Sequence, residues 1–165
     1  MTGFKFKQFE IHQDRCAMKV GTDGVLLGAW APGGKRILDI GSGTGLISLM
    51  MAQRFPEAQV LGIDMDGEAC EEAAENVAES PFANRVGIEC CRLQDYHSEE
   101  SFDAIVSNPP FFLNSLKNPD SKRTMARHTD SLPFRDLFRG AKMLLSDDGV
   151  FSVIVPSEVL EVVVS

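Results

Sequence analysis

The chain has 165 residues, of which 44% are hydrophobic, and its formal net charge is −8 at pH 7. This size and hydrophobic content fit one globular domain with a core of its own. The negative charge argues against binding of nucleic acid by the whole surface, although it leaves room for a local basic patch. No apolar run approaches the roughly 20 residues of a membrane span, and the N-terminus lacks the apolar core of a signal peptide. We therefore expect a cytoplasmic protein.

The cysteines give no sign of a disulfide framework or a metal site. No two of the four are spaced as a Cys-x-x-Cys pair, and neighbouring cysteines form a disulfide only with strain. We expect reduced, structural thiols at Cys16, Cys70, Cys90 and Cys91.

Short β-branched runs alternate with helical patterns from Arg36 onward. Strands are predicted at 35–40, 59–64, 86–90, 102–107 and 149–155, the last after an Asp148-Gly149 turn, and helices at 45–54, 67–80 (capped by Asp66) and 133–145. Strands separated by helices indicate a Rossmann-like α/β fold with a doubly wound parallel sheet. We expect a single domain over residues 1–165, in which residues 1–34 precede the Rossmann-like core at 35–165.

A glycine-rich turn, DIGSGTG at 39–45, joins the first of these strands to the first helix. Gly41, Gly43 and Gly45 stand where the backbone must turn tightly and approach a ligand. A dinucleotide fingerprint needs Gly or Ala three residues after its second glycine, where this chain has Leu46. The spacing therefore disfavours NAD and favours a cofactor without phosphates, such as S-adenosylmethionine.

Acidic side chains are placed to bind such a cofactor. Asp39 and Asp64 supply carboxylates for its ammonium group and its ribose, and Asp64 ends the second strand, where it can accept bonds from both ribose hydroxyls. Met65 is placed to pack on the adenine face, and Asp95, after the third strand, to reach the adenine amino group. A glycine turn with capping aspartates explains any one of these features, but not their combination.

The fourth strand ends in SNPPFF at 107–112. The Asn108 side-chain oxygen and the Pro109 carbonyl can accept the two N–H groups of a planar amine, and Phe111 can stack on the base that carries it. Together Asn108, Pro109, Pro110 and Phe111 form the predicted catalytic motif, which acts by positioning and electrostatics. The alternative is a strand-ending turn that buries the two phenylalanines in the core.

These motifs carry a family resemblance. DIGSGTG, GIDMD and SNPPF resemble class I S-adenosylmethionine-dependent methyltransferases that act on an exocyclic or amide nitrogen. The block FKFKQFEIHQDRCAMKVGTDGVLLGAWA at 4–31 closely resembles the bacterial tRNA1(Val) adenine N6-methyltransferase family, and the likeness runs to about Pro156. The resemblance implies methylation of the adenosine that follows the anticodon.

The resemblance also implies roles for residues before the first strand. In that family this segment borders the cofactor, which implies that Lys19, Gly21, Thr22 and Asp23 help to shape the pocket. The catalytic tetrapeptide is often Asn-Pro-Pro-Tyr in the family, whereas Asn-Pro-Pro-Phe occurs here and in guanine N2-methyltransferases of ribosomal RNA.

The family fold implies seven strands, of which the last two form an antiparallel hairpin. Only about ten residues follow Pro156, which is too few for a helix and two strands. We expect a chain that lacks this hairpin, with truncation favoured over coverage by a partner chain. The fifth predicted strand would then be an exposed edge through which the chain could self-associate.

Basic residues follow the catalytic motif. The window 117–142 has a net charge of +4, while the rest of the chain has −12. Predicted RNA contacts in this window are Lys117, Lys122, Arg123, Arg127 and His128, and Lys5 and Lys7 alternate with phenylalanines at the N-terminus. The alternatives are a solvated loop and helix face for the window and a frayed terminus for the N-terminal pair. We interpret His128 as a phosphate or surface contact rather than a catalytic base, because this chemistry needs no general base.

The leading hypothesis is a tRNA1(Val) (adenine(37)-N6)-methyltransferase that uses S-adenosylmethionine. The alternatives are a ribosomal RNA guanine N2-methyltransferase, a protein glutamine N-methyltransferase and an inactive S-adenosylmethionine-binding module.

Overall fold

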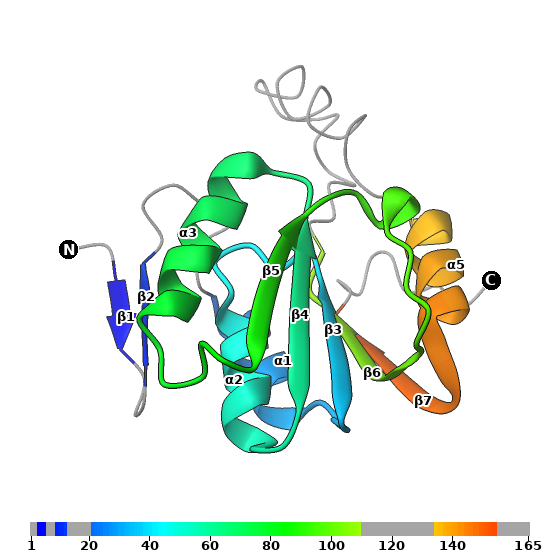
Figure 1. Cartoon of the computed structure of the whole chain (residues 1–165), viewed down its shortest axis with the longest axis horizontal. Helices are drawn as coiled ribbons and strands as arrows, with labels where there is room; N and C mark the ends of the chain where they lie inside the picture. The colour runs from blue at the N-terminus through cyan, green and yellow to red at the C-terminus, as the bar shows by residue number, and fades with distance from the viewer. Residues whose placement is uncertain (1–2, 6–8, 13–20, 110–133, 155–165) are drawn as a thin grey trace.

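The computed structural model describes residues 3–5, 9–12, 21–109 and 134–154 (Figure 1). Its centre is a five-stranded parallel sheet in the order β5-β4-β3-β6-β7. The strands are β3 (Arg36–Ile40), β4 (Gln59–Asp64), β5 (Val86–Cys90), β6 (Phe102–Ser107) and β7 (Leu145–Val153). The helices are α1 (Thr22–Trp30), α2 (Leu46–Arg54), α3 (Gly67–Ala78), α5 (Phe134–Leu144) and the 3-10 helix η1 (Leu93–Asp95). The predicted parallel α/β sheet is confirmed.

The strand order reverses at β3. This strand pairs with β4 on one side and with β6 on the other, so the chain runs outward from β3 to β5 and then returns to start again at β6. Ligands of open α/β sheets bind outside the carboxyl ends of the strands at such a switch point. The fold therefore directs attention to the residues that follow β3 and β6.

Alternate residues of the central strand β3 face two different cores. Ile37 of β3 lies in the core that α1, α2 and α3 cover, whereas Leu38 lies in the core with Leu137 of α5 and Leu93 of η1. Figure 1 shows α5 and β7 at the opposite end of the molecule from α3. The centre of the sheet is thus packed on both faces, as is usual for parallel sheets, while Gly87 and Glu89 of β5 are exposed.

A two-stranded antiparallel sheet precedes the core. It consists of β1 (Gly3–Lys5) and β2 (Glu10–His12). Phe9 makes an edge-to-face contact with Phe82, with 6.2 Å between the ring centroids, and Ile11 is fully buried. Because residues 3–5 pair with β2, the frayed terminus proposed as an alternative is wrong for this stretch.

The structure corrects the start of β7 and refines the helix bounds. Pairing with β6 begins at Leu145, opposite Phe102, and then shifts so that Val150 lies opposite Ala104. The expected Asp148-Gly149 turn is therefore an irregularity inside a longer strand rather than its beginning. α2 begins at Leu46, one residue late, because Gly45 has a left-handed φ of 87°. Asp66 caps α3 as predicted, by accepting a hydrogen bond from the Glu68 N–H.

Three cysteines fall in the described residues, and all three, Cys70, Cys90 and Cys91, are free. Cys16 lies outside those residues. In the described part of the chain no helix is long and apolar enough to cross a membrane, and no three metal-ligating side chains gather.

Candidate active site

The glycine loop, residues 41–45, leaves the carboxyl end of β3 and enters α2. Its three glycines all have positive φ, of 74° at Gly41, 53° at Gly43 and 87° at Gly45, a region that side-chain-bearing residues rarely adopt. Gly41 is exposed, and a Cβ atom there would meet no heavy atom within 4 Å. The predicted tight turn is confirmed, and the space over Gly41 is open to a ligand.

Hydrogen bonds from β4 and α3 hold this loop in place. The N–H groups of Gly41 and Ser42 both donate to the Ile63 carbonyl, at 2.8 and 3.0 Å. The Asn76 side chain of α3 donates to the Thr44 carbonyl at 2.8 Å. The loop is therefore held in one shape before any ligand arrives, which lowers the entropic cost of binding.

Asp39 is fully buried beneath the loop. Its Oδ2 accepts a hydrogen bond of 2.8 Å from the Ser48 hydroxyl. Burial raises the pKa of Asp39 to about 7, the Ser48 hydrogen bond lowers it in part, and the charge of Asp64 raises it further. Among the described residues Asp39 Oδ1 and the buried Ser42 hydroxyl have no hydrogen-bond partner.

The two buried oxygens without a partner, on Asp39 and Ser42, are relevant to whether the expected cofactor fits this site. Unpartnered buried polar atoms are costly, so a site that leaves them unpaired fits a bound polar group or an ordered water nearby. The observation is compatible with a cofactor that carries an ammonium group. A direct contact between that group and Asp39 stays a prediction, because the carboxylate has no exposed surface.

Gly62 of β4 lets the strand lie close to Ser42 and Ser48. This role of Gly62 was not predicted from the sequence. A Cβ atom on Gly62 would lie 2.8 Å from the Ser42 Cβ atom and 2.9 Å from the Ser48 hydroxyl oxygen. The available signal was the isolated glycine inside a predicted strand, which often marks close approach of another segment.

Asp64 joins the glycine loop to the start of α3. Its Oδ2 accepts a 2.8 Å hydrogen bond from the Gly43 N–H, and its Oδ1 accepts a 2.9 Å bond from the Asp66 N–H. Burial raises the pKa of Asp64, while these backbone hydrogen bonds lower it. A carboxylate has about four acceptor positions, so room remains for a ribose hydroxyl. Met65 follows with 37% of its surface exposed, as a residue packing on a ligand ring would be in the free protein.

Asn108 follows β6 at the same edge of the sheet. Ser107 pairs with Ile40, so Asn108 and Gly41 leave adjacent strands at adjacent positions. Asn108 is half-buried and Pro109 is buried. The structure therefore brings the predicted amine clamp beside the predicted cofactor loop.

The first turn of α1 packs beside Asn108. A Cβ atom on Gly24 would lie 3.4 Å from Asn108 Nδ2 and 3.5 Å from the Leu46 side chain. Three residues named from the family resemblance, Gly21, Thr22 and Asp23, begin this helix and are exposed. Their placement agrees with the expectation that the segment before the core borders the site, while their contact with a cofactor stays a prediction.

Comparison with known proteins identifies the family of the chain. The sequence model of the methyltransferase small domain matches residues 20–161. A relative from Bacteroides thetaiotaomicron is 50% identical over 161 residues, covering 96% of this chain and 68% of the relative. A relative from Phocaeicola vulgatus is 55% identical over 157 residues, covering 94% and 67%. Both are named tRNA1(Val) (adenine(37)-N6)-methyltransferase. The chain belongs to this family.

This methyltransferase spans about two thirds of the length of those curated relatives. Solved structures agree on the fold. The CcbJ methyltransferase from Streptomyces caelestis has a TM-score of 0.58 at 21% identity, covering 82% of this chain and 49% of its own. The geranyl diphosphate C-methyltransferase from Streptomyces coelicolor has a TM-score of 0.58 at 17% identity, covering 78% and 41%. At such identities the likeness supports the Rossmann-like class I methyltransferase fold alone.

In this family member Asp95 lies in η1, directly after β5, as predicted. Its Oδ2 accepts a 3.0 Å hydrogen bond from Arg92 Nε in an ion pair whose side chains are 58% and 56% exposed. Arg92 was not among the predicted site residues. The contact of Asp95 with adenine stays a prediction.

Several predicted site residues lie outside the described residues. They are Pro110, Phe111, Lys7, Lys19, Lys117, Lys122, Arg123, Arg127 and His128. Lys5 lies in β1, and its side chain is not described.

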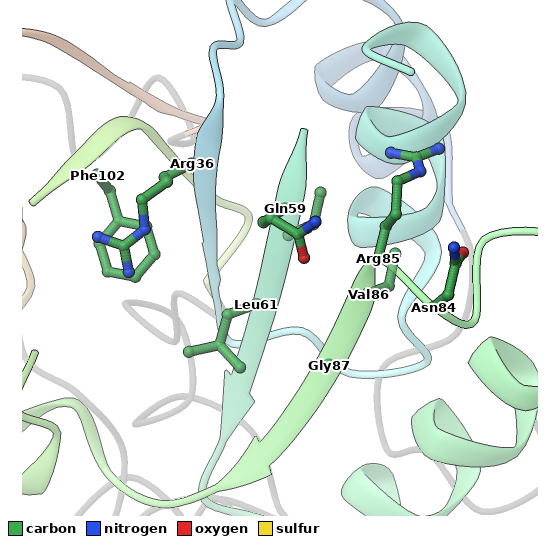
Figure 2. A pocket seen from close by; sticks show the side chains of 9 residues that line it. Arg36, Gln59, Leu61, Asn84, Arg85, Val86, Gly87 and Phe102 are labelled. Atoms are coloured by element: carbon green, nitrogen blue, oxygen red, sulfur yellow. The ribbon is translucent and has the colours of Figure 1, made fainter. Parts of the chain in front are cut away.

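A pocket of about 340 Å³ lies at the other end of the strands (Figure 2). Arg36, Gln59, Val86 and Phe102, which begin β3, β4, β5 and β6, line it. Arg36 stacks over the Phe102 ring, 4.5 Å from its centroid, and donates to the Ser101 carbonyl. Because this pocket opens at the amino ends of the strands, it does not belong to the site around Asn108.

Proposed function

We propose that this methyltransferase transfers a methyl group from S-adenosylmethionine to N6 of adenine 37 in tRNA1(Val). The observation that carries the proposal is the placement of Asn108 and the glycine loop on adjacent strands at one edge of the sheet. Family membership supports the substrate, since the relatives at 50% and 55% identity bear that name.

The residues at this edge fit the cofactor. Bound S-adenosylmethionine supplies an electrophilic methyl group on a sulfonium. The open backbone at Gly41 accommodates close approach, and Asp64 offers its remaining acceptor positions to the ribose hydroxyls. Asp95 faces solvent beside β5, where the adenine amino group would be bound.

Asn108 and Pro109 prepare the acceptor nitrogen. The Asn108 side-chain oxygen and the Pro109 carbonyl each accept one N–H of the adenine amino group, which favours a pyramidal nitrogen whose lone pair points at the methyl group. With S-adenosylmethionine held by Asp64 and the glycine loop, its methyl group would pass to this nitrogen, the sulfonium would become a thioether, and the nitrogen would lose a proton to solvent during or after transfer. The chain's contribution is positioning and electrostatics.

An exposed basic stripe on α5 supports RNA as the substrate. Arg135, Arg139 and Lys142, spaced by four and three residues, lie on one exposed side of the helix. Because α5 runs directly into the amino-edge start of β7, its N-terminus lies toward the edge that carries Asn108. At the far end of the molecule α3 exposes Glu68, Glu71 and Glu75 (Figure 1).

This asymmetry of charge favours binding of the tRNA phosphates along α5 rather than α3. Replacing Arg135 and Arg139 with Gln should lower tRNA affinity and reduce the slope of log affinity against log salt by roughly 0.7–0.9 for each phosphate that is no longer neutralised. Lys35→Gln, at an exposed cation of the amino edge, is the matched control and should leave the slope unchanged. Equal slopes in all three proteins would remove α5 from the RNA-binding surface.

Methyl transfer tests the proposal as a whole. The full chain is incubated with S-adenosylmethionine and an unmodified tRNA1(Val) transcript, and the nucleosides are analysed by mass spectrometry. We expect N6-methyladenosine at position 37 with the wild type and none with Asn108→Ala. Methylation of a ribosomal RNA guanine or of a glutamine amide instead would establish one of the alternative functions. Binding of cofactor with no transfer to any acceptor would indicate a binding module.

The proposed function also predicts where in the cell the protein is found. A tRNA-modifying enzyme works where tRNA is used, so we expect this protein in the cytoplasm.

A further inference from the structure

Ser107 stands between the two halves of the site. It is the last residue of β6 and directly precedes Asn108, and it pairs with Ile40, which directly precedes Gly41. Its surface is fully buried. The residue therefore connects the clamp and the cofactor loop along both the chain and the sheet.

Hydrogen bonds fix Ser107 on both sides. Its hydroxyl donates to the Ile40 carbonyl at 2.8 Å, and its own carbonyl accepts from the Ile154 N–H at 3.2 Å. One residue beyond Ile40, the Gly41 N–H donates to the Ile63 carbonyl, next to Asp64. This row of bonds runs along the carboxyl edge of the sheet from β7 to β4, and Ser107 supplies its link between β6 and β3.

We propose that Ser107 is a positioning residue for methyl transfer, whose hydroxyl sets the separation between Asn108 and the glycine loop. The inference rests on the proposed function, since it concerns the alignment of the acceptor nitrogen with the cofactor. Transfer between two bound groups is sensitive to small displacements, and a 1 Å misplacement can cost about 100-fold in rate.

A buried serine that bonds a carbonyl could serve stability alone, and the chain offers a matched control for that case. Ser80 is 9% exposed, and its hydroxyl donates to the Val77 carbonyl at 2.7 Å, just after the end of α3. Ser80→Ala therefore removes a hydroxyl donation of similar length without touching the carboxyl edge of the sheet, and it also removes the 3.2 Å bond that this hydroxyl accepts from the Phe82 N–H.

The test compares Ser107→Ala with Ser80→Ala in the full chain. We measure Tm, the Kd for S-adenosylmethionine by calorimetry, and kcat and KM for the tRNA1(Val) transcript. For Ser107→Ala we expect kcat to fall by about 10- to 100-fold while the cofactor Kd stays within about twofold. Ser80→Ala, which loses an accepted bond as well as a donated one, should lower Tm at least as much and leave kcat within about twofold. Equal kcat values in the two variants would overturn the positioning role.

A second variant and a measurement of hydrogen exchange also test the role of Ser107. If Ser107→Ala does not fold, Ser107→Cys, which weakens the bond to the Ile40 carbonyl because a thiol is a poor donor, should fold and show a selective loss of kcat, and an unchanged kcat would overturn the proposal. Amide hydrogen exchange over residues 40–45 measures how firmly the Ser107 hydrogen bond holds the glycine loop, and this measurement does not depend on catalysis. Faster exchange in the Ser107 variant than in Ser80→Ala supports it, and equal exchange contradicts it. If the wild type methylates no tRNA but the exchange difference is present, the proposed function is refuted. The conclusion that Ser107 holds the glycine loop then still stands.

Discussion

At the residue scale, Asp39 is a titratable group that the fold removes from water. It is fully buried beneath the glycine loop, and Ser48 is its hydrogen-bond donor. Desolvation penalises the charged carboxylate and raises its pKa from 3.8 to about 7. The folded protein therefore retains a proton that the unfolded chain has already lost at pH 5 or 6.

This difference predicts a pH dependence of stability. Because the folded state binds more protons than the unfolded state between pH 4 and 7, the contribution of Asp39 to the free energy of unfolding falls as pH rises through that window, by up to about 1.4 kcal/mol per pH unit. Asp39→Asn removes the titration but keeps an oxygen for the Ser48 hydroxyl. The stability of the variant relative to the wild type should rise from pH 5 to pH 8 in urea denaturation. A difference that stays constant with pH would show that Asp39 is ionised throughout.

At the scale of elements, β4 is shaped by its contact with the glycine loop. Gly62→Ala would place a methyl group 2.8 Å from the Ser42 Cβ atom, which forces the loop or the strand to move. Overpacking of this kind costs about 1–3 kcal/mol. We expect that decrease in stability in denaturant unfolding, with weaker binding of S-adenosylmethionine because the loop that shapes the site is displaced.

Gly87→Ala in β5 is the control for this effect. Its new Cβ atom would meet only a Leu61 methyl carbon, at 3.6 Å, which is an ordinary contact. The variant should unfold within about 0.5 kcal/mol of the wild type, as substitutions without a clash do. Equal destabilisation at the two glycines would mean that any side chain in a strand glycine position is harmful, and that the loop contact is not the cause.

Sequence reasoning recovered the features that nearby residues encode. The glycine loop, the Asp66 cap and the sites of β3 to β6 each follow from a few consecutive residues, and the structure has them all. It missed the contacts that the fold makes between distant residues. Ser107 and Ile40 are 67 positions apart, and Ser42 meets Gly62 only once β4 lies against the loop.

The start of β7 was misplaced for a related reason. The Asp148-Gly149 pair is a strong local turn signal, so the strand was expected to begin after it. Pairing with β6 lets the strand begin at Leu145 and absorb these residues in a register shift. Pairing with β6 therefore outweighed the local preference of Asp148-Gly149 for a turn.

At the scale of the whole molecule, the two ends of the sheet have different roles, with the candidate site at one end and stabilising hydrogen bonds at the other. The carboxyl ends carry the glycine loop, Asp64 and Asn108, and here Asp39 and Ser42 have buried oxygens without a partner and the space over Gly41 is open. At the amino ends, Arg85 donates to the carbonyls of Ala52, Phe55 and Ala58, and Arg36 is bound to Ser101 and Glu100. Polar groups there are satisfied within the chain, as expected of a region that serves stability.

The edge of the sheet predicts self-association. Among the described strands β7 pairs only with β6, and Val150 on it is 44% exposed. An uncovered edge offers unpaired backbone groups to another chain. We expect the sedimentation coefficient to rise with protein concentration, and Val150→Lys to suppress the rise. A coefficient that is independent of concentration in the wild type would argue that the edge is covered.

One measurement tests the central claim most directly, namely that cofactor binding and methyl acceptance are separate tasks of neighbouring strand ends. S-adenosylmethionine is titrated by calorimetry into the wild type, Asp64→Ala, Asn108→Ala and the control Asp66→Ala, and each protein is assayed for methyl transfer to tRNA1(Val). Asp64→Ala should bind the cofactor about 10- to 100-fold more weakly, because it loses charge-assisted hydrogen bonds to the ribose and the loop. Asn108→Ala should bind normally and transfer no methyl group, and Asp66→Ala should lose only about 1 kcal/mol of stability with the α3 cap. Normal binding by Asp64→Ala, or full turnover by Asn108→Ala, would contradict the placement of the active site at this edge of the sheet.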